Sequence, residues 1–246
     1  FIADAIAREF GIPGFIVDPV VVDEFDELAR ISGIPEIERK SLLHALNIRY
    51  IARLMAAELG KKLDEVNLIG VHMGGGISVA AIKNGRVADV NNALLGMGPF
   101  SPQRAGALPI GDLLELAYSG KYTHPQLVKY LTKTAGLMAY LGTDSGIEVN
   151  ERIQAGDAKA KLITNAMCYQ VAKEVGACAT VLMGKVDAIY LSGGLVYNDY
   201  IVQQIRSRVE FIAPIKLYPG EREMEALCQG GLRVLNGLEE ARDYNY

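Results

Sequence analysis

The spacing of apolar residues along the chain alternates between a helical period and a strand period. Apolar positions recur at i, i+3, i+4 and i+8 within residues 2–10, which predicts an amphipathic helix. The β-branched run Phe15–Val22 follows a glycine and predicts a buried strand. Residues 41–59 return to the helical spacing. Because helices and strands alternate in this way, we expect an α/β fold.

The clearest hairpin pattern lies in the middle of the chain. The apolar runs Ile77–Ile82 and Val87–Val90 flank Asn84-Gly85, a pair that supplies the positive φ angles of a type I′ turn. Three further strands are expected at residues 67–71, 187–191 and 215–218. Further helices are expected at about residues 111–118, 125–134, 148–154, 158–182, 199–209 and 221–240, with Gly230-Gly231 interrupting the last.

Composition narrows the classes of protein that fit this pattern. With 50% hydrophobic and 22% charged positions among 246 residues, the chain can bury one large core or two modest ones, which excludes disordered and fibrous proteins. The formal net charge is −4 and no basic block is present, which argues against nucleic-acid binding. No apolar run approaches the roughly 18 residues of a membrane span. We therefore expect neither a nucleic-acid nor a membrane partner.

The cysteines indicate the compartment. Cys168, Cys178 and Cys228 are odd in number and include no CxxC pair or histidine at metal-ligand spacing. This usage fits a reduced cytoplasm and implies no zinc site. The expected localisation is cytoplasmic.

Two glycine clusters follow predicted strands. Gly74, Gly75 and Gly76 lie between a strand and the hairpin, where backbone N–H groups without neighbouring Cβ atoms can surround a phosphate. Gly193 and Gly194 lie between a strand and a helix, which is a common place for a nucleotide. Taken alone, the glycine triplet is more typical of a tight turn with no ligand, and the second cluster also fits any sharp turn between a strand and a helix.

A third cluster is the Gly- and Pro-rich loop at residues 96–106, which contains Arg104. A guanidinium held on a stiff loop can bind a charged ligand in a fixed orientation. Arg104 could also be an ordinary solvent-exposed cation, and this segment alone does not separate the two interpretations.

Together, segments in order along the chain resemble the butyrate kinases, which form acyl phosphates and are related to the acetate kinases. The resemblance runs from near residue 1 to about residue 238 and rests on FIVDPVVVDEF, RKSLLHALN, VHMGGGISVAAIKNGRVADVNNALLGMGPFSPQRAGALP, LSGGLVYND and FIAPIKLYPGEREMEAL. It implies the two-domain actin-like ATPase fold shared with sugar kinases, hsp70 and actin, with a cleft between the domains.

The resemblance also bears on domain organisation. The chain opens at Phe1 rather than at an initiator Met, and the phosphate loop of the Asn-Pro-Gly-Ser-Thr type, with which family members begin, is not in this sequence. We expect residues 1–62 to be the end of the N-terminal acetate kinase-like domain. Residues 63–246 are expected to be the C-terminal domain, which carries the nucleotide-binding loops.

Three residues match catalytic positions of the family. Arg104 matches the arginine that stabilises the transferring phosphoryl group, and a planar guanidinium suits that role. His44 matches a histidine that hydrogen-bonds the same group, although on its own a histidine in this apolar helix would be read as a core residue. Asp18 matches an aspartate near the metal and the phosphoryl group. Its place in an apolar run also implies a cation, a metal or hydrogen-bond donors beside it.

Further residues match positions that bind the metal and the nucleotide. Glu223 matches a glutamate that helps to hold Mg²⁺, and Glu221 is a less favoured register for that match. His72, with Gly74, Gly75 and Gly76, matches the second phosphate loop, and Gly193 with Gly194 matches the adenosine loop. Relatives carry an Asp and, two residues later, an Arg for adenosine contact, whereas this chain has Ser145 and Ile147 at the matching positions.

The resemblance implies ATP-dependent phosphorylation of a short-chain fatty-acid carboxylate by direct in-line transfer, with Mg²⁺, and the reverse reaction that makes ATP. It also implies a homo-oligomer, dimeric or larger. Two alternatives remain open. One is an acetate or propionate kinase, because a single methylene contributes only about 1–3 kcal/mol of discrimination. The other is a nucleotide-binding fragment without catalytic activity.

Overall fold

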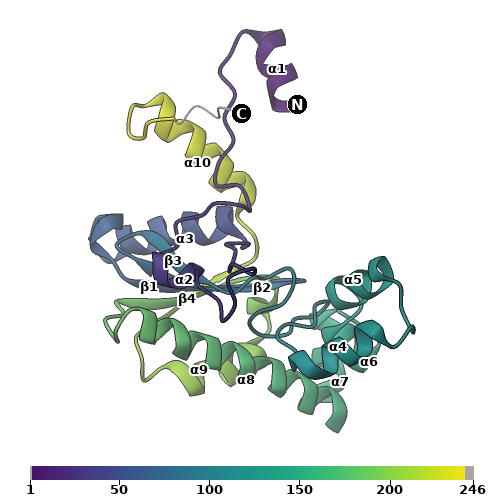
Figure 1. Cartoon of the computed structure of the whole chain (residues 1–246). Coiled ribbons are helices and arrows are strands. Elements are labelled where there is room, and N and C mark those ends of the chain that lie inside the picture. The colour runs from purple at the N-terminus through teal and green to yellow at the C-terminus, as the bar shows by residue number, and fades with distance from the viewer. Residues whose placement is uncertain (1, 242–246) are drawn as a thin grey trace.

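The computed structural model describes residues 2–241, and a five-stranded sheet in the order β3-β2-β1-β4-β5 lies at its centre (Figure 1). β2 pairs antiparallel with β1 and β3, whereas β4 pairs parallel with β1 and β5. The expected α/β class is confirmed. The strands are β1 (Leu68–Met73), β2 (Ile77–Lys83), β3 (Arg86–Val90), β4 (Ala188–Gly193) and β5 (Ile215–Pro219).

Helices cover both faces of this sheet, with α3 on one face and α8 and α9 on the other (Figure 1). None of the helices within residues 2–241 is long and apolar enough to cross a membrane. The helices are α1 (Ile2–Phe10), α2 (Glu27–Arg30), α3 (Ala45–Glu58), α4 (Ile110–Tyr118), α5 (His124–Lys133), α6 (Gly136–Leu141), α7 (Gly146–Gln154), α8 (Ala158–Val181), α9 (Asp199–Val209) and α10 (Glu223–Leu235), with 3₁₀ turns η1 (Leu63–Glu65) and η2 (Gly194–Tyr197).

Alternation of side chains along the central strands produces two hydrophobic cores. In β1, Ile69, Val71 and Met73 pack into the core that contains α8 and α9, while Leu68 packs into the core that contains α3. Successive side chains of a strand point to opposite faces, so a strand covered by helices on both faces is apolar throughout. This explains the continuous apolar run in β1.

The predicted hairpin is confirmed. β2 and β3 are joined at Asn84-Gly85, where both residues have positive φ, 49° and 75°. A Cβ at Gly85 would lie 2.7 Å from the Leu63 side chain, so the turn also requires glycine for close packing.

The predicted strand Phe15–Val22 is wrong. The segment has no regular structure, and Ile16, Val20 and Val21 are largely exposed. Asp18 in the middle of the segment has φ 40°, which is outside the strand region, and no residue of the segment pairs with a strand of the sheet. Its polar contacts go instead to the chain before α3, where the Ser41 hydroxyl donates to the carbonyl of Val22.

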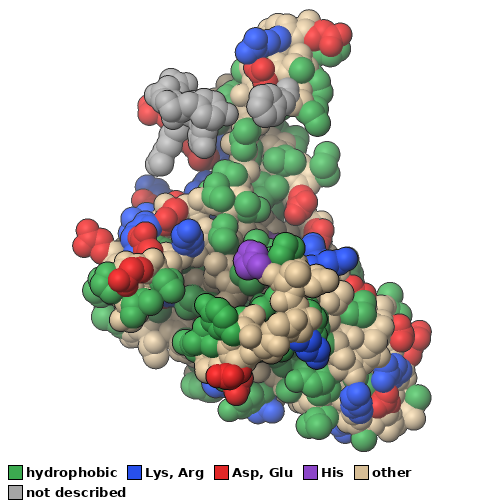
Figure 2. Space-filling view, turned by 45° about the vertical axis from the view of Figure 1, so that its right-hand side comes forward, with side chains coloured by type: hydrophobic (Ala, Val, Ile, Leu, Met, Phe, Trp, Pro, Cys, Tyr) green, Lys and Arg blue, Asp and Glu red, His purple; other side chains and the backbone are tan. Residues whose placement is uncertain are grey.

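Residues 2–40 form what we call the arm, which runs from α1 to the body of the molecule. The helix predicted at residues 2–10 is confirmed as α1, but none of its residues is buried, and it stands apart from the sheet (Figure 1). Hydrophobic side chains are visible along this part of the surface (Figure 2). The arm packs closely on α10, because a Cβ at Gly230 would lie 2.5 Å from the Val17 side chain. The predicted interruption at Gly230-Gly231 is wrong, since α10 continues through it.

Candidate active site

Three buried polar side chains lie side by side across the sheet. His72 of β1 is in register with Ser78 of β2 and with Ser192 of β4. All three are at most 2% exposed. The Ser192 hydroxyl lies 3.3 Å from His72 Nδ1. We call Ser78, His72 and Ser192 the polar row; it lies on the face that α3 covers, because Ala80 and Tyr190, two residues along their strands from Ser78 and Ser192, pack into the α3 core.

His44 lies over this row. The residue is the N-cap of α3, which begins at Ala45 rather than at the predicted residue 41. Its ring stacks on that of His72 with the centroids 4.3 Å apart, and its Nδ1 lies 2.8 Å from the hydroxyl of Ser78. Burial, together with the charge of Arg104, lowers the pKa of His44 to about 4. Burial and the neighbouring His44 lower the pKa of His72 to about 3, so both rings are neutral at pH 7.

Arg104 lies against the glycine loop. A Cβ at Gly76 would overlap its guanidinium, so only glycine allows the backbone to approach so closely. Nη1 of Arg104 donates to the carbonyl of Ala93 at 2.6 Å, whereas its buried Nε has no hydrogen-bond partner within the described residues. Burial lowers the pKa of Arg104, but a guanidinium remains charged at neutral pH. The guanidinium therefore keeps donor capacity that no described residue takes up.

The loop that carries Arg104 is fastened to the glycine loop. The Ser101 hydroxyl donates to the carbonyl of Gly75 at 2.7 Å, and the Gln103 backbone N–H donates to the same oxygen at 3.3 Å. The Gln103 side chain donates to Asp144 at 2.7 Å. These hydrogen bonds fix the position of the loop that carries Arg104 relative to the glycine loop.

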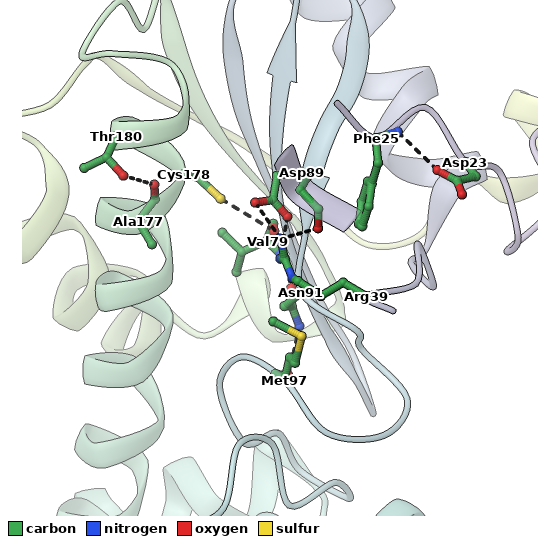
Figure 3. A network of polar contacts seen from close by, with 11 residues as sticks. Asp23, Phe25, Arg39, Val79, Asp89, Asn91, Met97, Ala177, Cys178 and Thr180 are labelled. Carbon is green, nitrogen blue, oxygen red and sulfur yellow. Dashed lines mark hydrogen bonds and ion pairs between the residues drawn. The ribbon is translucent and has the colours of Figure 1, made fainter. Parts of the chain in front are cut away.

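Asn91, which follows β3, anchors the start of this loop (Figure 3). Its side chain accepts from the backbone N–H of Val79 at 2.7 Å and donates to the carbonyl of Ile77 at 3.0 Å. A Cβ at Gly98, whose φ is 77°, would overlap Asn91. Since Asn91 is only 1% exposed, its bonds to β2 position the loop rigidly.

Two glutamates were candidates for the metal, and Glu221 is the one that lies against the glycine loop. Its Oε1 is 3.7 Å from a Cβ built on Gly74, and His72 Nε2 is equally close to that point. Glu223 is exposed in the first turn of α10. Residues 2–241 contain no cluster of three or more metal-ligating side chains. A single carboxylate beside the glycine loop still fits Mg²⁺, because this ion takes most of its ligands from phosphates and water.

Asp18 lies in a different environment. Its carboxylate forms an ion pair with Nε of Arg49 at 2.6 Å, and Arg49 also pairs with Glu24. Burial raises the pKa of Asp18, while Arg49 opposes that rise. The expected cation beside Asp18 is therefore present. The structure joins this residue to α3 and brings together the other two predicted catalytic residues, His44 and Arg104.

In the glycine pair Gly193-Gly194, the structure requires glycine only at the first position. Gly193 has φ 91°, and a Cβ there would overlap the backbone of Met73. Gly194 has no atom within 4 Å of a built Cβ, so that side of the turn is open. This turn also meets α7, because Asn198 donates to the carbonyl of Gly146 at 3.4 Å.

The departure from the family pattern lies beside this turn. Ser145 caps α7 by accepting from the backbone N–H of Glu148 at 3.3 Å, and Ile147 is 76% exposed. Asp144 is engaged by Gln103. Neither of these two contacts requires a nucleotide, and each has a local structural role, whereas Ile147 points to solvent.

Sequence reasoning missed Ser78, Ser192, Asn91 and Gln103. The available signal for Ser78 was a single hydroxyl residue in the otherwise apolar run Ile77–Ile82. A buried polar residue needs a partner, but the partner of Ser78 is 34 positions away, and local patterns do not identify it.

Comparison with known proteins gives the family of the chain. The model of the Acetokinase family matches residues 36–218. Butyrate kinase 1 and butyrate kinase 2 of Clostridium acetobutylicum are each 53% identical to this chain over 243 residues, which make up 99% of this chain and 68% of each relative.

Solved structures show the same fold. The acetate kinase of Porphyromonas gingivalis superimposes with a TM-score of 0.75 at 22% identity, over 85% of this chain and 61% of that one. A propionate kinase from Francisella tularensis superimposes with a TM-score of 0.74 at 20% identity, over 84% of this chain and 60% of that one. This chain thus spans about three fifths of each solved enzyme. It belongs to the acetokinase family.

Proposed function

We propose that the protein transfers a phosphoryl group between ATP and the carboxylate of a short-chain fatty acid, with butyrate as the first candidate. The two relatives at 53% identity are butyrate kinases, and membership of a kinase family implies ATP and ADP as the nucleotides. The observation that carries the proposal is the meeting of Arg104, His44 and the loop Gly74–Gly76 at one point.

This arrangement suits the transition state of phosphoryl transfer. A carboxylate oxygen attacks the γ-phosphorus while the bond to the β,γ-bridging oxygen breaks, and the products are an acyl phosphate and ADP. The carboxylate is already a nucleophile, so no general base is needed. Arg104 brings the charge of its guanidinium to these oxygens at the glycine loop, and the neutral ring of His44 lies beside them.

Mg²⁺ belongs to the same proposal. When bound, it would neutralise charge on the β- and γ-phosphates. Glu221 is the carboxylate placed to hold it, with Glu223 and Asp18 as the positions that the family resemblance favours. For the nucleotide, we assign the open side of Gly194 to the adenosine and the loop Gly74–Gly76, next to His72, to the phosphates.

We also propose a homo-oligomeric, cytoplasmic enzyme with two domains. The boundary expected at residue 62 follows α3, yet α3 shares a hydrophobic core with the sheet. We therefore place the end of the first domain before α3, within or just after the arm.

Acyl-phosphate formation tests the proposed function directly. Purified protein with ATP and Mg²⁺ is given butyrate, isobutyrate, propionate or acetate, and the product is trapped with hydroxylamine. We expect the highest kcat/KM with butyrate. A higher value with acetate or propionate would reassign the substrate. ATP binding measured by calorimetry, with no acyl phosphate from any acid, would instead identify a nucleotide-binding protein without transferase activity.

A further inference from the structure

Ser78 stands out among the residues outside the predicted site. Its side chain is fully buried on the α3 face of the sheet, in register with His72. Its hydroxyl has two contacts, and both are with His44: the backbone N–H of His44 lies 3.3 Å away and the ring Nδ1 lies 2.8 Å away. A single serine thus holds both the backbone and the ring of the histidine.

Hydrogen accounting decides the direction of the shorter contact. The backbone N–H of His44 must donate to Oγ of Ser78. If Nδ1 also donated, the buried hydroxyl hydrogen would have no hydrogen-bond partner, because the described residues offer it no other acceptor within hydrogen-bond distance. Leaving a buried donor unpaired is unfavourable. The hydroxyl therefore donates to Nδ1, and a neutral ring then carries its hydrogen on Nε2.

We propose that Ser78 is a positioning residue that fixes His44 as the Nε2–H tautomer, so that the ring presents an N–H to the transferring phosphoryl group. The recipient of that N–H rests on the proposed function, whereas the tautomer rests on the contacts of Ser78 alone. A neutral ring with its lone pair on Nε2 would repel the phosphoryl oxygens, so the tautomer decides whether His44 helps the reaction.

Ser192 provides the internal contrast. It is as buried as Ser78 and lies in the same polar row, but its hydroxyl also has the carbonyl of Val71 within 3.2 Å. Its hydrogen therefore has an acceptor other than His72 Nδ1. Ser192 contacts His72 and not His44, so Ser192→Ala is a matched control for a buried serine removed from this row.

Nitrogen NMR of the histidines tests the tautomer without any assay of activity. The chain has three histidines, and the His44 signals are assigned from their loss in His44→Gln. Long-range ¹H–¹⁵N spectra at pH 7 distinguish the two neutral tautomers. We expect Nε2–H for His44 in the unmodified protein and in Ser192→Ala, and a mixture of tautomers in Ser78→Ala. His44 as Nδ1–H in the unmodified protein, or an unchanged tautomer in Ser78→Ala, would overturn the proposal.

Kinetics then separate positioning from folding. We expect Ser78→Ala to lower kcat about tenfold, roughly the effect of one hydrogen bond, with KM for ATP changed less than about twofold. Ser78→Thr keeps the hydroxyl and should recover both the tautomer and kcat. An Nε2–H tautomer in a protein that makes no acyl phosphate would contradict the proposed function and leave the assignment of Ser78 intact.

Discussion

The sheet region and the arm are both rich in apolar residues, yet they differ in what those residues do. Ile48 and Ile51 of α3 are completely buried against the sheet. Within residues 2–40, only Phe25 and Ala29 are buried, while Ile16 is 82% exposed. Apolar composition therefore yields a core only where another surface is present to cover it.

The same contrast applies to the candidate site. His44 and Arg104 are held by partly buried hydrogen bonds, His44 to a strand and Arg104 to the chain that follows β3. Asp18, in the arm, has φ 40° and is held by its ion pair with Arg49. The sheet region thus holds the proposed anion site rigidly, whereas the position of Asp18 depends on one partner.

The largest expected effect is that of Arg104→Ala. Because it removes the guanidinium that lies against the glycine loop, kcat should fall by a factor of about 10² to 10⁴ while the Kd for ATP changes little. Steady-state kinetics and calorimetry measure the two quantities. Arg86→Ala, which removes an exposed arginine paired with Asp26, is the control and should keep kcat within about twofold. Unchanged turnover in Arg104→Ala would show that the rigid region is not the catalytic one.

The next largest effect comes from shortening one isoleucine side chain in each region, which compares the regions directly. Ile48→Ala should lower the free energy of unfolding by about 2–5 kcal/mol, because it leaves a cavity between α3 and the sheet. Ile16→Ala in the arm should cost less than about 0.5 kcal/mol, because the side chain is already exposed. Urea unfolding measures both values. Equal losses would mean that the arm is buried against a surface outside residues 2–241.

Acid should destabilise the polar row. The pKa of His72 is about 3 in the folded state, compared with 6.5 for an ordinary histidine. Below pH 6.5, His72 is therefore protonated in the unfolded chain but stays neutral in the folded chain. This contribution to stability is present above pH 6.5 and is lost as pH falls. From pH 7 to pH 5 we expect His72 alone to cost about 2 kcal/mol.

His72→Gln isolates this effect. Burial raises the pKa of Asp18 and Glu174, and these carboxyls act in the opposite direction in both proteins, so the difference in pH dependence between the proteins reports the histidine. Urea unfolding at the two pH values should show a smaller acid loss in His72→Gln. An identical acid loss in both proteins would mean that His72 is not held neutral.

The smallest expected effect distinguishes the two glutamates. Glu221→Gln should raise the Mg²⁺ concentration needed for half-maximal activity about tenfold, because its carboxylate lies against the glycine loop. Glu223→Gln, an identical change two residues away, should alter it less than about twofold. Titration of activity with Mg²⁺ at saturating ATP measures both. A larger effect of Glu223→Gln than of Glu221→Gln would instead support Glu223, the glutamate that the family resemblance favours.

Sequence patterns predicted most of the secondary structure. The hairpin at Asn84-Gly85 and the helix that became α8 agree with the structure to within two residues, because their periods and turn residues act locally. The strand expected at Phe15–Val22 failed, because Asp18 has a positive φ and the segment binds residues in and before α3, contacts that no local pattern encodes.

By itself, the sequence determined the α/β class, the glycine loops and the family, since periodicity and ordered motifs are properties of the chain. Only the tertiary structure decided that Glu221 lies on the glycine loop, that Asp18 pairs with Arg49 and that Ser78 binds His44. The physical reason is that these contacts follow from sheet register and helix packing, which bring together residues far apart in the sequence.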